Sequence, residues 1–142
     1  MMKPLFASLL LVALPFCDQC GQGEAKEGET LHALLDGLEG AELSFSAREE
    51  RLESIRALKL SEPETRATRD SCVKLHASLL EAEQATREAS PRLEALERLP
   101  AEERTLEEEE AIRALLVRSH EALREAESQR EECLNGMLRL KR

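Results

Sequence analysis

The stretch "REECLNG", residues 130–136, places a cysteine near the end of a long run of charged residues, alanine and leucine. The only other cysteine outside the first 20 residues is Cys72. Two cysteines so far apart in sequence can be bridged only if the fold brings their backbones close together. If Cys133 pairs with Cys72, the segments that contain them must pack against each other.

Helix-start signals divide the chain around these cysteines. The sequences "SARE" from Ser46, "SEPE" from Ser61 and "TLEE" from Thr105 fit the capping box, in which a Ser or Thr caps a helix and a Glu follows three residues later. Pro63 suits a first helical turn, whereas Pro91 should kink or restart its helix. The signals predict helices over 47–60, 63–98 and 106–140, a turn at 99–104 that can form one helical turn, and a short helix over 31–39.

The two long predicted helices carry small or apolar residues alternately three and four apart, which is the heptad spacing of a coiled coil. When they fold antiparallel about the 99–104 turn with Cys72 opposite Cys133, the remaining positions come into register. The facing pairs are then Thr68/Met137, Leu75/Arg130, Leu79/Ala126, Ala82/Leu123, Thr86/Ser119, Ala89/Leu116 and Leu93/Ile112.

This register predicts a disulfide between Cys72 and Cys133, with two unpaired buried cysteines as the alternative. The expected fold is all-α: an antiparallel, coiled-coil-like helical hairpin, with the helix over 47–60 packed on it through Leu52, Ile55 and Leu58 as a small bundle. The bundle domain is assigned to residues 30–142. The polar, glycine-containing stretch 17–29 is predicted to be a flexible tether.

The first 16 residues, "MMKPLFASLLLVALPF", have a lysine near the start and then an uninterrupted apolar run, which is typical of a signal peptide. The run is shorter than the roughly 20 residues of a membrane-spanning helix. Cleavage is expected either before Cys17 or near residue 25. Cys17 would become a lipidation site in the first case, although Phe16 is larger than the residue usual before a lipidated cysteine. We therefore expect an exported protein, periplasmic or extracellular, with a lipid anchor as its only membrane attachment.

Composition and motifs argue against several activities. The net charge of -9 and the near absence of aromatic residues disfavour nucleic acid as a partner. The Cys17/Cys20 pair has redox or zinc spacing, but it lacks a second ligand pair or a strand pattern. The glutamates at 107–110 are expected to stabilise a helix start rather than bind calcium. His32, His76 and His120 form no catalytic grouping, so we expect no enzyme, no metal and no cofactor.

The leading hypothesis is an exported structural or interaction protein that binds another protein through a helix face or its acidic tip. Three alternatives remain: an envelope holdase chaperone, a helical protein associated with a lipid surface, and a thiol redox or metal-handling protein using Cys17 and Cys20. The sequence resembles exported coiled-coil proteins in composition and periodicity only. That likeness names neither a partner nor an oligomeric state.

Overall fold

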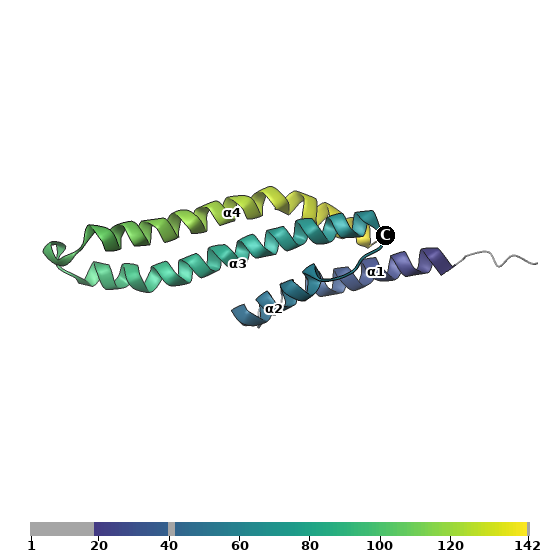
Figure 1. The fold of residues 1–142 in the computed structure, drawn as a ribbon, viewed down its shortest axis with the longest axis horizontal. Helices are drawn as coiled ribbons and strands as arrows, with labels where there is room; N and C mark the ends of the chain where they lie inside the picture. The colour runs from purple at the N-terminus through teal and green to yellow at the C-terminus, as the bar shows by residue number, and fades with distance from the viewer. Residues whose placement is uncertain (1–18, 40–41, 142) are drawn as a thin grey trace, which may run out of the picture.

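The structure, a computed structural model, describes residues 19–39 and 42–141. Within these ranges the chain is helical and contains no strand, so the all-α prediction is confirmed (Figure 1). The elements are α1 (Gln19–Asp36), α2 (Phe45–Arg56), α3 (Pro63–Arg98), the 3-10 turn η1 (Ala101–Glu103) and α4 (Leu106–Leu140).

The two longest helices, α3 and α4, form an antiparallel hairpin that η1 closes at one end (Figure 1). Both run over the residues that the sequence predicted. The Thr105 hydroxyl caps α4 by accepting a hydrogen bond from the Glu108 amide. The predicted restart at Pro91 is wrong, because α3 continues through it. A proline removes one internal hydrogen bond from a helix, and a helix of 36 residues keeps the others.

The other two helices lie along one side of the hairpin, near its open end (Figure 1). Helix α1 runs in the same direction as α3, and α2 runs in the opposite direction (Figure 1). The core is formed there by Leu31 and Leu35 of α1, Leu52 and Ile55 of α2, and Val73 of α3, all buried. We call the part of the hairpin that lies nearer η1, residues 79–98 and 106–126, the distal arm. Helix α2 reaches its near end, through the ion pair of Arg48 with Glu83 and the contact of Phe45 with Arg87.

The prediction of a flexible tether over 17–29 is wrong for residues 19–29, which belong to α1; residues 17 and 18 lie outside the described part. The Glu27 carboxylate accepts hydrogen bonds from the amide and hydroxyl of Ser61, each 2.9 Å long. Gly28 is buried against Leu140, so closely that a Cβ on residue 28 would lie 3.3 Å from its side chain. Glycine here permits a close approach rather than flexibility.

Two of the predicted caps are wrong, and one of them moves the start of its helix. The cap of α2 is Ser44, whose side chain accepts from the Ala47 amide, and not Ser46, so α2 covers 45–56 rather than 47–60. Glu62 caps α3 by accepting from the Thr65 amide, whereas Ser61 is engaged with Glu27. A capping residue needs an extended backbone as well as an oxygen, and the Ser/Thr pattern alone does not report backbone conformation.

The seam between α3 and α4 is close to the predicted register but rotated. The predicted Thr86/Ser119 layer is present, with its hydroxyl oxygens 3.0 Å apart, whereas Thr68 faces Gly136 rather than Met137. Small residues fill the distal seam, because they let the two backbones approach closely. The buried ones are Ala82, Ala85, Ala89, Ser119, Ala122 and Ala126, whereas the predicted seam residues Leu79, Leu93, Leu116, Leu123 and Arg130 remain exposed.

Candidate functional site

The Cys72–Cys133 pair ties α3 to α4 at the end of the hairpin that α1 and α2 cover. The two sulfur atoms lie 2.06 Å apart and the Cα atoms 4.7 Å apart, so the pairing expected from the register is present in the structure. Both side chains are buried and belong to the core cluster that includes Leu35. The crosslink therefore fixes the base of the hairpin and leaves the distal arm to its own packing.

Next to this crosslink, α1 lies over the surface between α3 and α4. The cleft along its edge is lined by residues of all three helices, including Leu35, Leu75 and Met137. Leu31 and Leu35 are buried in that contact. We call the surface between α3 and α4 on this flank the hairpin groove. Its first half is thus filled by a helix of the chain itself, which presents leucines at helical spacing.

Past the end of α1, helix α2 reaches the hairpin near Leu79, and the described part of the chain places no other helix over the surface beyond it. On α4, Leu123 and Leu116 lie two and three heptads before Met137, which lines the α1 cleft, and residues seven apart share nearly the same helix face. On α3, Leu79 lines a hollow with Leu38, which follows the end of α1, and with Leu52 of α2; Leu93 lies two heptads further on. We call these four leucines and the surface between them the distal groove.

The leucines of the distal groove are substantially open to solvent. Exposed fractions are 41% for Leu79, 37% for Leu93, 46% for Leu116 and 48% for Leu123. The rotated seam explains this exposure, because each helix buries its alanines and turns these leucines to one flank. Grouped large aliphatic residues that remain exposed are candidates for a binding surface. Leu106, Val117, Leu134 and Leu138 of α4 are also exposed, to a similar or greater degree.

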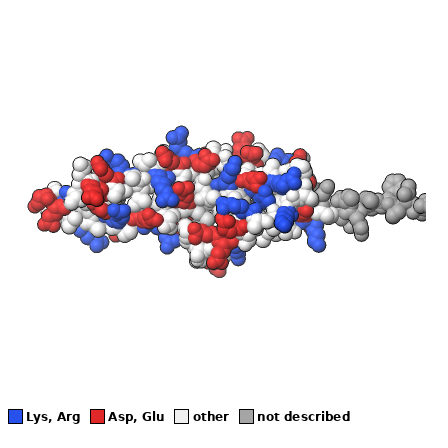
Figure 2. All heavy atoms as spheres, in the orientation of Figure 1, with Lys and Arg blue, Asp and Glu red and all other residues white. Residues whose placement is uncertain are grey.

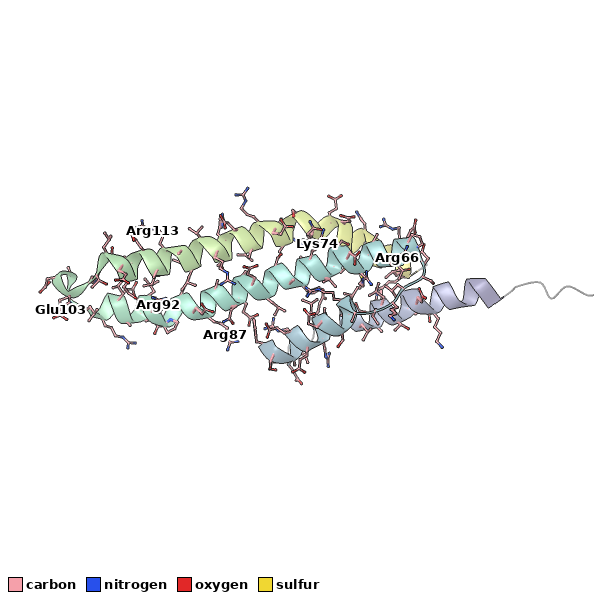
Figure 3. The ribbon with its side chains drawn as sticks, viewed as in Figure 1. Arg66, Lys74, Arg87, Arg92, Glu103 and Arg113 are labelled. Atoms are coloured by element: carbon pink, nitrogen blue, oxygen red, sulfur yellow. A yellow bond between two sulfur atoms is a disulfide. The ribbon has the colours of Figure 1, made fainter. Side chains whose placement is uncertain are left out.

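Charged residues of both signs lie on the two helices beside the leucines of the distal groove. On the α3 edge, Glu83 is paired with Arg48 at 2.6 Å and Glu94 with Arg98 at 3.7 Å. On α4, Arg113 is one turn before Leu116 and Arg124 follows Leu123, and neither has a carboxylate within 4.0 Å among the described residues. Acidic residues are equally near in the helix: Glu109 lies one heptad before Leu116, and Glu127 lies one turn after Leu123. Figure 3 labels Arg113 on the distal part of α4.

The opposite flank of the hairpin is closed by ion pairs. Arg92 of α3 donates two hydrogen bonds to the Glu108 carboxylate, at 2.8 and 2.9 Å, which lowers the pKa of Glu108. Arg118 donates to Glu81 at 2.9 Å. Arg92 and Arg118 therefore already have acidic partners on that flank.

Acidic residues gather at the tip of the hairpin (Figure 2), where Figure 3 labels Glu103. In the first turn of α4, Glu107 and Glu109 are exposed, and Glu108 is engaged with Arg92. Carboxylates in a first turn stabilise the unpaired amides of the helix start. The tip therefore contains a helix-start cluster and shows no built binding site.

The three histidines have different surroundings. His32 contacts Asp36, one turn later in α1, at 3.1 Å. His76 is half-buried on α3, and burial lowers its pKa while the charge of Glu39 acts in the opposite direction. His120 is exposed on α4. Within the described residues, no three His, Cys, Asp or Glu side chains are placed to hold a metal ion.

The other sequence-predicted sites fall outside the description. Cys17 precedes the described residues, and Cys20 lies in the first turn of α1, where the side chains are not described. The lipidation site and the Cys17/Cys20 pair therefore stay predictions. No helix in the described ranges combines the length and apolar character needed to cross a membrane. In comparisons with protein families, curated proteins and solved structures, the chain matched none.

Sequence reasoning missed the distal groove, because it assigned all four of its leucines to the seam. A signal was present: on both helices the neighbouring heptad position is occupied by small residues, Ala85 on α3 and Ala122 and Gly136 on α4. A stripe of small residues beside a stripe of leucines gives each helix two faces through which it can contact the other. Contact through the small residues brings the two helices nearer to each other and leaves the leucines exposed.

Proposed function

We propose that this chain is an exported protein-binding module and that the distal groove is its binding surface. The observation that carries the proposal is the row of four half-exposed leucines in line with the part of the hairpin groove that α1 fills. The base of the hairpin is held by the disulfide and by two covering helices, so the arm can present this surface without help from its partner. A pre-organised surface loses little conformational freedom on binding.

Export is supported by the signal-peptide pattern of residues 1–16 and by the Cys72–Cys133 pair, since disulfides persist mainly in oxidising compartments. The proposed location is the cell envelope or the extracellular space. The intact mass of the protein from its native host tests this part. A mass that lacks the leader and gains two alkyl groups only after reduction supports export, whereas an intact leader with free thiols contradicts it.

The binding surface is tested by a charge placed in the groove. The double variant Leu116→Glu/Leu123→Glu puts two carboxylates among the leucines, and Ala114→Glu puts one on the exposed outer face of the same helix. Each tagged protein is expressed with its leader in the native host, and co-purified proteins are quantified by mass spectrometry. We expect at least one protein that is enriched with the wild type and with Ala114→Glu and is lost with the double variant.

Circular dichroism and urea unfolding of all three proteins show whether the double variant is folded. A set of co-purified proteins that is the same for the wild type and a folded double variant would remove the distal groove as the binding surface. A double variant that fails to fold is replaced by Leu116→Gln, which is uncharged and disturbs the arm less.

A further inference from the structure

From the α1 cleft, which lies between α1, α3 and α4, we infer a second binding site that takes a short apolar peptide with a free amino terminus and a free carboxyl terminus. The site is independent of the proposed function, because Leu116 and Leu123 do not line this cleft. Three observations support it: the apolar lining of the cleft, the opposite charges at its two ends, and the distance between those ends.

The first observation is that apolar residues from all three helices line the α1 cleft. Its volume is about 310 Å³, which is at the lower end of the range of small-molecule sites. Leu35 and Cys133 are buried beside it, whereas Leu134 and Leu138 of α4 remain 49% and 61% exposed. A ligand with apolar side chains would remove part of this leucine surface from water, which is favourable.

The second observation is that the two ends of the α1 cleft carry opposite charges. His32 and Lys141 also line a neighbouring hollow at the base of the hairpin. His76 and Glu39 also line the hollow on the side of the distal arm that contains Leu79. Lys141 therefore lies at one end of the cleft and Glu39 at the other. Neither has an oppositely charged side chain within 4.0 Å among the described residues.

The third observation is the length of the α1 cleft. Residues 32 and 39 lie about two helical turns apart, on the order of 10 Å, on α1 and the turn that ends it. An extended chain of three residues covers about the same distance. A tripeptide can therefore place its ammonium group beside Glu39 and its carboxylate beside Lys141, which fixes its direction in the cleft. The remaining carboxylate, that of Asp36, is already in contact with His32 at 3.1 Å.

His76 adds a hydrogen-bonding group for the peptide backbone. Its ring is half-buried and lines the α1 cleft. Burial lowers the pKa of His76, against the opposing charge of Glu39, so the ring is uncharged at neutral pH. A neutral imidazole donates one hydrogen bond and accepts another. His76 can therefore bind a peptide group without changing the charge difference between the two ends of the cleft.

The test uses synthetic tripeptides: Leu-Ala-Leu with free ends, the same peptide acetylated at its amino terminus, the same peptide amidated at its carboxyl terminus, and Ser-Ala-Ser with free ends. Binding to the disulfide-bonded protein is followed by NMR through the shifts of its backbone amide signals. We expect free Leu-Ala-Leu to shift the amides of residues 32–39 and 133–141. Blocking either end should weaken binding roughly two- to five-fold, and Ser-Ala-Ser should not bind.

Two variants assign the ends of the peptide to the ends of the cleft. Glu39→Gln should remove the effect of acetylation and retain that of amidation, and Lys141→Gln should do the reverse. The matched controls are Glu42→Gln and Arg139→Gln, which change the same charges at exposed residues that do not line the α1 cleft. Both controls should leave the two effects unchanged.

Equal binding of the free, acetylated and amidated peptides overturns the inference, as do effects of blocking that Glu39→Gln and Lys141→Gln do not remove. The absence of binding at about 10 mM peptide, or amide shifts confined to other parts of the protein, also overturns it. If the same amides shift with protein concentration alone, the cleft is occupied by a second copy of this chain instead. None of these results involves Leu116 or Leu123, so the proposed function stands or falls by its own test.

Discussion

Gly136 of α4 lies so close to Thr68 of α3 that a Cβ on residue 136 would lie 2.5 Å from the Thr68 hydroxyl oxygen. No Cβ of a stable protein comes this near, and the neighbouring atom belongs to a β-branched side chain that cannot turn away freely. At the base of the hairpin, α3 and α4 can therefore lie this close only because residue 136 has no side chain.

Gly136→Ala is expected to lower the free energy of unfolding by about 1–3 kcal/mol, because the added methyl group overpacks the seam. Urea unfolding measures the change. Gly23→Ala is the matched control: a Cβ at residue 23 meets nothing within 4 Å, so it should be neutral or stabilise α1 by up to about 1 kcal/mol. In a Thr68→Ala background the cost of Gly136→Ala should shrink, and an unchanged cost would contradict the close contact.

Removal of the crosslink by Cys72→Ser/Cys133→Ser is expected to cost about 4 kcal/mol of unfolding free energy, because the bond closes a loop of 61 residues in the unfolded chain. The same loss is expected when the wild type is reduced. Urea unfolding with and without reductant measures it, and the variant itself is the control, since reductant should not change its midpoint. A wild-type midpoint that is insensitive to reduction would show that the bond does not form.

Ser44→Ala is expected to destabilise the protein by about 0.5–2 kcal/mol, because the Ser44 hydroxyl accepts the hydrogen bond of the Ala47 amide at the start of α2. Ser46→Ala, two residues later, removes the hydroxyl that the sequence pattern favoured and should cost less. Thermal or urea unfolding of both variants gives the comparison. A larger loss for Ser46→Ala would move the helix start back to the position expected from the capping box.

His76 predicts a pH dependence of stability. Burial lowers its pKa below 6.5, so the unfolded chain binds this proton more readily than the folded one. The free energy of unfolding should therefore fall as pH decreases through about 6.5 toward the pKa of the folded state. His76→Gln should flatten this dependence between about pH 7.5 and about pH 5.5. An identical pH dependence in wild type and variant would contradict the burial of the neutral ring.

Much of the fold could be predicted from the sequence where two independent signals agree. The long helices had both heptad periodicity and a capping residue, as at Thr105, and their bounds were right. The Cys72–Cys133 pairing and the Thr86–Ser119 layer followed from one register. Single signals did less well: the glycines of residues 19–29 indicated flexibility, although Gly28 is buried against Leu140.

The candidate site could not be predicted, because a heptad pattern leaves the rotation of each helix about its own axis undetermined. Turning α3 and α4 to face through Leu79 and Leu116 or through Ala85 and Ala122 differs by about one residue step, roughly 100° of rotation about each helix axis. The choice depends on how closely the backbones approach, and the alanine seam brings them nearer. The leucines left outside form the distal groove, so the binding surface follows from the packing and not from the pattern.

The central claim is that the distal groove contacts a protein, and site-specific photo-crosslinking in the native host tests it most directly. A photoreactive amino acid is placed at position 116, in the groove, and at position 114, on the outer face of the same helix. We predict a discrete crosslinked product from position 116 that is absent from position 114 and disappears when Leu123→Glu is added. Equal products from both positions, or none from position 116, would contradict the account.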